Sequence, residues 1–92
     1  MIESFKHKGL KKLYQHGDQK QLDPRFIGRI EDILARLDVA DVIQDMNLPG
    51  YSLHALKGTL KNQWSVLVSR NWRIIFRFEN GSVFDVDLID YH

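Results

Sequence analysis

The stretch QWSVLVSRNWRIIFRFENGSVFDVDLID, residues 63–90, decides the fold of this 92-residue chain. Its apolar and polar residues alternate with a period of two, which is typical of strands that bury one face. We expect strands over 64–68, 72–78 and 84–89, with loops at 69–71 and 80–82, and a shorter strand upstream over 51–56. Connections this short join antiparallel neighbours, so the stretch predicts an antiparallel meander.

The alternation also predicts which residues lie opposite each other. With three residues in each loop, Val66 faces Ile74 and Phe76 faces Val86. The even-numbered strand residues then share one apolar face: Trp64, Val66, Val68, Trp72, Ile74, Phe76, Phe78, Phe84, Val86 and Leu88. A two-residue Asn-Gly loop is rejected, because it would place Phe76 opposite Asp85.

The odd-numbered face of the sheet carries the polar residues. Arg77 is expected across from Asp85 as an ordinary charge pair. Arg73 has only Ile89 directly opposite, which makes it a candidate anion site. A diagonal pair with Asp87 is the structural alternative for this arginine.

Helical spacing precedes the sheet. A first helix is predicted over 8–16 and ends at Gly17, and a second begins with Asp23 as N-cap and Pro24 as its first residue. The second helix carries one apolar stripe, formed by Phe26, Ile27, Ile30, Ile33, Leu34 and Leu37. Arg29 is expected on the opposite, solvent-facing side.

These two helices are the available cover for the apolar face of the sheet. We therefore predict an α+β fold, with two N-terminal helices packed on one face of a small antiparallel β-sheet. One domain is expected over 1–92, because a chain of this length supports one modest core. Residues 1–5 are interpreted as an edge strand.

Composition excludes several classes of protein. The chain has no cysteine, which excludes disulfides, thiol catalysis and cysteine-ligated zinc. No apolar run approaches the roughly 18 residues of a membrane span, and the polar start does not resemble a signal peptide, so we expect a soluble cytoplasmic protein. His7 and His16 lack metal-ligand spacing, and no P-loop, HExxH or dinucleotide motif is present. We expect no metal and no cofactor.

The net charge of +1 says little about partners, but lysines cluster near the start of the chain. They are Lys6, Lys8, Lys11 and Lys12. Such a cluster suits a nucleic-acid contact, and it equally suits the solvated face of a helix.

Chemistry-bearing residues gather at one end of the predicted sheet: His54, Lys57, Asn71, Arg73, Asp90, Tyr91 and His92. They offer imidazoles and an ammonium for proton transfer, a guanidinium for a phosphate, and a ring for stacking on a base. Metal-free RNA cleavage uses such a set, because a base must remove the 2′-OH proton while cations stabilise the charge on the phosphate. Taken singly, Lys57 also reads as a loop lysine and His92 as a loose terminal residue.

Four segments together resemble the HigB-type toxins of the RelE/ParE superfamily: IESFKHKGLKKLY (2–14), YSLHALKG (51–58), NQWSVLVSRNWRIIFRFENG (62–81) and the terminal DYH (90–92). The resemblance covers essentially the whole chain and implies the RelE-like microbial RNase fold. It further implies a bacterial type II toxin that cleaves mRNA in the ribosomal A site, without a metal. The implied partners are the ribosome with its 16S rRNA, mRNA, and a HigA-type helix-turn-helix antitoxin, with operator DNA bound only through the toxin–antitoxin complex.

The resemblance also implies roles for residues. The implied catalytic residues are His54, Lys57, Arg73, Asp90, Tyr91 and His92. The implied RNA-binding residues are Asn71, Arg70 and Lys61, with Lys8, Lys11 and Lys12 as ribosome contacts. One departure concerns SVLVS (65–69), where similar sequences carry a basic residue; here Arg70 is the first basic residue, one step into the turn.

Two other functions are left open. A ParE-like protein shares the fold and inhibits DNA gyrase without catalysis, although the LHALKG and DYH segments favour an enzyme. A small RNA-binding module, or a degenerate toxin kept for its antitoxin-facing surface, is the third reading.

Overall fold

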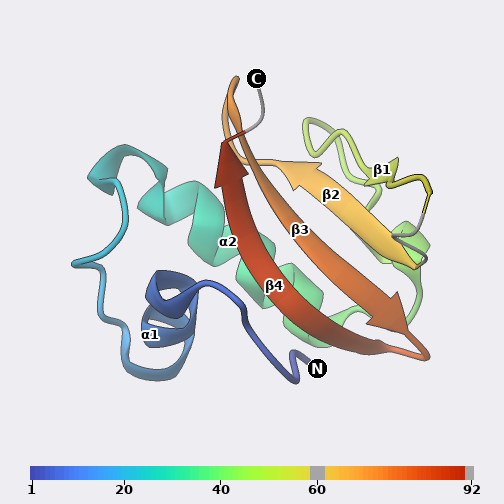
Figure 1. Cartoon of the computed structure of the whole chain (residues 1–92), viewed down its shortest axis with the longest axis horizontal. Helices are drawn as coiled ribbons and strands as arrows, with labels where there is room; N and C mark the ends of the chain where they lie inside the picture. Colours follow the sequence, from blue (N-terminus) through green and yellow to red (C-terminus); the bar gives the residue numbers. More distant parts are fainter. Residues whose placement is uncertain (59–61, 91–92) are drawn as a thin grey trace.

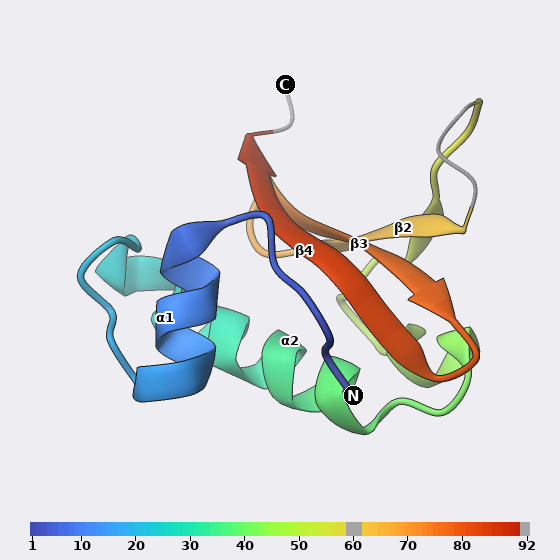
Figure 2. The same ribbon diagram turned by 60° about the horizontal axis from the view of Figure 1, so that its bottom comes forward.

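A computed structural model describes residues 1–58 and 62–90 of the chain. Its elements, in order, are α1 (Lys8–His16), the 3-10 turn η1 (Pro24–Phe26), α2 (Ile27–Val39), the 3-10 turn η2 (Ile43–Met46), and strands β1 (His54–Ala55), β2 (Gln63–Leu67), β3 (Trp72–Glu79) and β4 (Ser82–Asp90). The strands form one antiparallel sheet in the order β1-β2-β3-β4, and both helices lie on the same side of it (Figures 1 and 2). The α+β prediction is confirmed.

The predicted end of the first helix is confirmed, and the predicted start of the second is confirmed only in part. Gly17 adopts a left-handed conformation with φ of 69°, and its N–H donates to the carbonyl of Leu13. Asp23 accepts a hydrogen bond from the backbone N–H of Arg25, but Pro24 opens a 3-10 turn and the α-helix proper begins at Ile27. None of the helices in the described ranges has the length and apolar character needed to cross a bilayer.

The hairpin between β2 and β3 has the predicted register. Val66 pairs with Ile74, and the N–H of Val68 donates to the carbonyl of Trp72 across the loop. Alternation along both strands therefore directs Val66, Ile74 and Phe76 toward the helices, and all three are buried.

The prediction for the hairpin between β3 and β4 was wrong. Glu79 pairs with Ser82, so the loop contains only Asn80 and Gly81, the arrangement that the apolar pattern had rejected. Both loop residues have positive φ, 50° and 80°, as in the two-residue turns whose twist matches that of the strands.

A β-bulge in β4 reconciles this short turn with the apolar pattern. The register shifts between Ile75 and Arg77, at a point where Asp85 on β4 has a φ of 58°. Before the bulge Val83, not Phe84, faces the core, whereas beyond it Val86 is buried as predicted. One extra residue in β4 thus returns the strand to the predicted register.

The bulge also corrects the predicted pairing of Arg77. Its direct neighbour on β4 is Phe84, whose ring centroid lies 4.3 Å from the guanidinium carbon. The ion pair with Asp85 still forms, with 3.5 Å between Nε and Oδ2, and Arg77 also pairs with Glu79. Phe84 therefore belongs to the exposed face and not to the core.

The first residues of the chain lie along β4, as the edge-strand prediction required, and they run parallel to it. Isolated bridges join Ile2 to Val83 and Phe5 to Val86. The hydroxyl of Ser4 accepts the N–H of Asp85 at 2.9 Å, which satisfies a donor in the bulge. Figure 2 shows this segment passing between α1 and the outer edge of β4.

The core fills the space between the helices and the even-numbered face of the sheet. Its helical side includes Leu10, Leu13, Ile27, Ile30, Ile33, Leu34 and Leu37, and its sheet side includes Val66, Val68, Ile74, Phe76, Val83 and Val86. The predicted apolar stripe is thus buried, apart from Phe26, which lies in η1 and is only partly buried.

The predicted strand over 51–56 is reduced to His54–Ala55, because its first residue belongs to the core. Tyr51 is buried, and its hydroxyl donates to Asp32. Arg29 stacks on the ring of Tyr51 at 4.4 Å and donates to the carbonyls of Gly50 and Leu67. Arg29 is therefore not a solvent-facing residue as predicted; it ties α2 to the chain just before β1.

Candidate active site on the exposed face of the sheet

The face of the sheet turned away from the helices carries one continuous row of neighbours across all four strands. His54 on β1 pairs with Ser65, Ser65 pairs with Ile75, and Ile75 pairs with Asp87. Directly paired residues project from the same face. His54 is exposed, so its imidazole is presented to solvent at the β1 end of this row.

Arg73 lies on the same face, two residues from Ile75 along β3. Its direct neighbours are Leu67 and Ile89, as the predicted register required. Its guanidinium donates through Nη1 to the hydroxyl of Ser65 at 3.3 Å. The side chain of Arg73 therefore reaches diagonally toward β1.

This diagonal contact links Arg73 to the strand partner of His54. Paired residues of neighbouring antiparallel strands lie about 4.5–5.5 Å apart at Cα. Since Ser65 is the direct partner of His54, Arg73 contacts the residue paired with His54. Two of the predicted residues, Arg73 and His54, thus lie on the same face of the sheet, each beside Ser65.

Lys57 follows β1 by two residues and is exposed. The N–H of Leu56 donates to the carbonyl of Gln63 at 2.9 Å, which keeps the chain beside β2 up to that point. Lys57 thus leaves the sheet at the same edge as His54. Lys61 lies outside the described residues.

A second group of predicted residues lies at the end of the sheet where β4 finishes. Asp90 pairs with Trp72, and Trp72 directly follows the turn that contains Arg70 and Asn71. Arg70, Asn71 and Asp90 are all exposed. Figure 1 shows the C-terminal end of β4 beside the β2–β3 turn. Tyr91 and His92 lie outside the described residues.

The two groups are separated by the width of the sheet. From His54 to Asp90 there are three strand spacings, about 14 Å, and three residues along the strand, about 10 Å. Arg73 lies between them, on β3. Asp90 is the partner of Trp72, a residue of the helix-facing side, so alternation directs Asp90 to the face opposite Arg73, at the end of the sheet. On the exposed face itself the structure places His54 and Arg73.

The lysines of α1 form a separate surface. Lys8, Lys11 and Lys12 are exposed on a helix that contacts α2 and β4. Because β4 and β1 are opposite edges of the sheet, these lysines do not join the group at His54 (Figure 1).

The clearest pKa shifts occur in the helical layer. The carboxylate of Asp38 accepts a hydrogen bond from Tyr14 at 2.6 Å, which raises the pKa of Tyr14 to about 12 and lowers that of Asp38. Burial, followed by the hydrogen bond to Asp32, raises the pKa of Tyr51. These groups tie elements together and lie away from the exposed face of the sheet.

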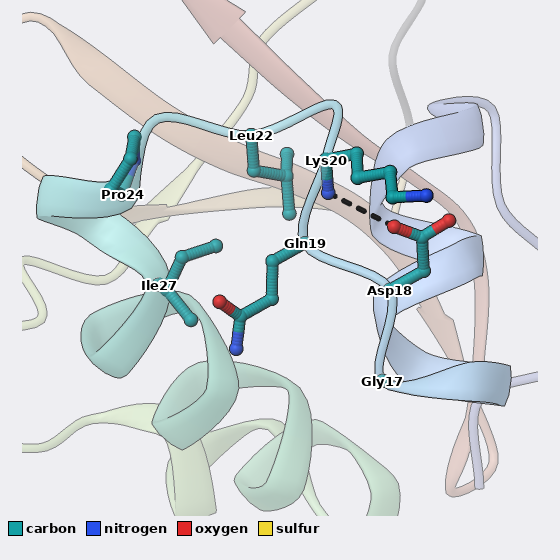
Figure 3. A pocket seen from close by; sticks show the side chains of 7 residues that line it. All are labelled: Gly17, Asp18, Gln19, Lys20, Leu22, Pro24 and Ile27. Carbon is teal, nitrogen blue, oxygen red and sulfur yellow. Dashed lines mark hydrogen bonds between the residues drawn. The ribbon is translucent and has the colours of Figure 1, made fainter.

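A cavity of about 670 Å³ lies between the end of α1 and the start of α2 (Figure 3). Leu22 and Ile27 contribute apolar side chains to its lining, and Asp18 accepts the backbone N–H of Lys20 at its rim. Its described lining contains none of the predicted site residues. The cavity is therefore not the candidate active site.

Sequence reasoning overlooked one residue of the row, Ser65. It was placed on the exposed face without a role, yet it is 2% exposed and contacts Arg73. The available signal was a serine at an odd position inside a strand of otherwise apolar and aromatic residues.

Comparison with known proteins supports the resemblance seen in the motifs. Residues 3–92 match the family described as the RelE-like toxin of type II toxin–antitoxin system HigB. The chain is 44% identical to the endoribonuclease HigB of Proteus vulgaris over 92 residues, covering 100% of both chains. It is 33% identical to toxin HigB-1 of Vibrio cholerae serotype O1 over 86 residues, covering 88% of this chain and 87% of the relative.

Solved structures show the same fold at low sequence identity. YoeB in its complex with YefM from Staphylococcus aureus aligns with a TM-score of 0.64 and 15% identity, covering 100% of this chain and 95% of that one. YafQ from E. coli aligns with a TM-score of 0.57 and 15% identity, covering 98% and 91%. Together with the full-length sequence match, they lead to one conclusion: this chain belongs to the HigB-like, RelE-like toxins of type II toxin–antitoxin systems.

Proposed function

We propose that this toxin is an endoribonuclease that cuts mRNA in the ribosomal A site, without a metal ion. The observation that carries the proposal is the contact of Arg73 with Ser65, which is the strand partner of the exposed His54. A cation and an imidazole on one open face match the two needs of RNA cleavage, charge stabilisation and proton transfer. The 44% identical relative is named an endoribonuclease, which supports the same class of enzyme.

In the proposed reaction the 2′-oxygen of one nucleotide attacks the adjacent phosphorus. A base takes the 2′-OH proton, the bond from phosphorus to the 5′-oxygen breaks, and an acid protonates that oxygen. Arg73 holds the phosphate and stabilises its developing charge. His54, Lys57, Asp90 and the terminal Tyr91 and His92 supply the proton-transfer and base-stacking groups that the family resemblance implies.

The open form of the site supports a requirement for the ribosome. The site is an open surface: His54 and Lys57 at one edge of the sheet and Arg70 and Asn71 in a turn are all exposed. A free RNA strand would lose its conformational entropy on being ordered there, which makes binding weak. A codon held in the A site is already ordered. We further propose that Arg70, Asn71 and Lys61 contact this RNA.

The lysines of α1 are proposed to contact ribosomal RNA, here Lys8, Lys11 and Lys12. Binding that depends on phosphate contacts weakens as salt concentration rises. Because the proposed target is the ribosome, the proposed location of this activity is the bacterial cytoplasm.

The proposed partner is a HigA-type antitoxin with a helix-turn-helix fold. Membership of a type II toxin family supports an antitoxin partner. A neutral toxin surface gives little reason for direct DNA binding, since the net charge is +1, so operator DNA would be bound through the antitoxin.

The test is primer extension on a reporter mRNA after brief induction of the chain. The variants are His54→Ala, Arg73→Ala and a chain lacking His92, and the matched controls are His16→Ala and Arg36→Ala, exposed residues of the helical layer. We expect discrete cuts within translated codons for the wild type and both controls, and their loss in the three site variants. Growth arrest with intact mRNA and induced DNA damage would instead indicate a gyrase-type target.

A further inference from the structure

We propose that Ser65 is a positioning residue, which directs the guanidinium of Arg73 toward β1 for RNA cleavage. This inference rests on the proposed function and adds to it a residue with no assigned role. Three observations carry it: the burial of Ser65, its contact with Arg73, and its pairing with His54.

Ser65 is a buried polar residue in the middle of β2. It is 2% exposed, and it lies between His54 on one side and Ile75 on the other. A buried hydroxyl is unfavourable unless it is hydrogen-bonded. Its oxygen accepts a hydrogen bond from Nη1 of Arg73 at 3.3 Å, so the guanidinium supplies a hydrogen-bond partner for the buried hydroxyl.

Strand stability alone does not favour a serine at this position. β-branched and aromatic residues fit a pleated, half-buried surface better, and the neighbours of Ser65 along β2 are Trp64 and Val66. A valine there would pack well but could not accept a hydrogen bond. The serine therefore provides the hydrogen bond to Arg73, although it packs less well than a valine would.

The contact holds Arg73 toward β2. Arginine has several rotatable bonds, and from the start of β3 its guanidinium could lie toward β2 or toward β4. The bond to Ser65 favours the β2 side, at the residue paired with His54. A phosphate held by Arg73 would then lie within reach of the imidazole, which is the geometry that proton transfer requires.

The proposal is tested by a double-mutant cycle on ribosomes programmed with a reporter mRNA that the wild-type chain cuts. The single-turnover cleavage rate at saturating toxin is measured for Ser65→Ala and Ser65→Cys, each alone and combined with Arg73→Ala. We expect each serine variant to slow cleavage about tenfold, because a bond to a charged group is lost. The toxin concentration that gives half the maximal rate should change little. Combined with Arg73→Ala, the serine variants should add less than about a twofold change.

The controls separate positioning from a general effect on the fold. Ser65→Thr keeps the hydroxyl and should restore most of the rate, and Ser82→Ala at the far end of β4 should have no effect. Urea unfolding of each variant establishes that it is folded. A folded Ser65→Ala chain with the wild-type rate overturns the proposal, and so does an equal loss with and without Arg73.

A readout that does not depend on activity completes the test. NMR of the guanidinium N–H groups should show restricted rotation of Arg73 in the wild type and faster rotation in Ser65→Cys, which is close to serine in size but a weak acceptor. Unchanged spectra would overturn the positioning role even if the Arg73→Ala chain cuts too slowly to be timed. A wild-type chain that cuts no mRNA on ribosomes would overturn the proposed function itself, and the spectra would still report on the contact.

Discussion

At the scale of single residues, the chemistry depends on a guanidinium and not merely on a positive charge. Arginine presents a rigid planar fork that matches phosphate oxygens, whereas lysine is a flexible point charge. Arg73 also uses one arm of its fork to contact Ser65, whereas a lysine has a single nitrogen to serve both that contact and the phosphate.

We therefore predict that Arg73→Lys will keep the fold and lower the cleavage rate by about ten- to a hundredfold, and that Arg73→Ala will lower it by about a hundred- to a thousandfold. The measurement is single-turnover cleavage of ribosome-bound mRNA. Arg36→Lys is the control, because Arg36 is exposed on α2 and forms a long 3.8 Å pair with Asp32. A folded Arg73→Lys chain that cuts at the wild-type rate would contradict a role for the fork.

Part of this site was readable from the sequence. Strand alternation alone placed Arg73 opposite Ile89 on the exposed face, and the structure agrees. The assignment of His54 came from a family resemblance, because a lone histidine on a two-residue strand carries no periodic signal. Ser65 was missed, since its importance depends on which way a neighbouring side chain turns, and rotamers are not encoded in a pattern of apolar positions.

At the scale of elements, the β3–β4 hairpin shows how a correct pattern led to a wrong turn. The alternation beyond the bulge was right, and extending it to the turn required three loop residues. The structure keeps the two-residue Asn80-Gly81 turn and inserts its irregularity at Asp85 instead. The bulge at Asp85 could not be recognised in the sequence, because an aspartate is equally common on the exposed face of a regular strand. The sequence signal for the observed loop was Asn80-Gly81, since both residue types readily adopt positive φ.

Two glycine substitutions, one in this turn and one in α2, should change stability in opposite directions. Gly81 has a φ of 80°, and a Cβ there would meet only the carbonyl oxygen of Asp41 at 3.5 Å, so Gly81→Ala should lower the free energy of unfolding by about 1–2 kcal/mol through backbone strain. Gly28 lies within α2 in open space, so Gly28→Ala should raise it by about 0.5–1 kcal/mol. Urea unfolding measures both. A destabilising Gly28→Ala would contradict the regular helix described here.

Arg29 gives the second prediction at this scale, because one side chain joins α2, the chain before β1, and β2. Replacing it with methionine leaves the carbonyls of Gly50 and Leu67 without its three hydrogen bonds. We expect a loss of about 1–3 kcal/mol in the free energy of unfolding and faster amide exchange at Leu67, whose N–H donates to Tyr51. Arg36→Met, on the exposed side of the same helix, should cost much less, and equal losses would show that Arg29 acts only through its charge.

At the scale of the whole molecule, one carboxylate links three distant parts of the chain. Asp38 at the end of α2 accepts the hydroxyl of Tyr14 from α1 and the backbone N–H of Ile2. Its pKa is lowered below 3.8, chiefly by the bond from Tyr14. Because the folded-state value is the lower one, its contribution to stability is present above pH 3.8 and is lost as the pH falls through the folded-state pKa.

Tyr14→Phe should therefore destabilise the chain by about 0.5 kcal/mol near pH 7, a small amount because the pair is open to solvent. The difference from wild type should shrink as the pH falls below 3.8 and Asp38 becomes protonated, since the pKa of Asp38 is lowered in the folded chain. It should also shrink as the pH rises from 10 toward 12, because the pKa of Tyr14 is raised to about 12 and ionisation removes the donor. Urea unfolding at these pH values measures the effect, and a difference independent of pH would contradict the link.

The pairing of the first residues with the last strand has a consequence for how the toxin is made. The backbone N–H groups of Glu3 and Lys6 donate to the carbonyls of Val83 and Val86, so the opening segment has no partner on the sheet until β4 has been synthesised. Without β4 the core also lacks Val83 and Val86. A chain synthesised only as far as β3 therefore cannot complete its fold. Its first residues wait for β4, and the two segments join the structure together in one late step.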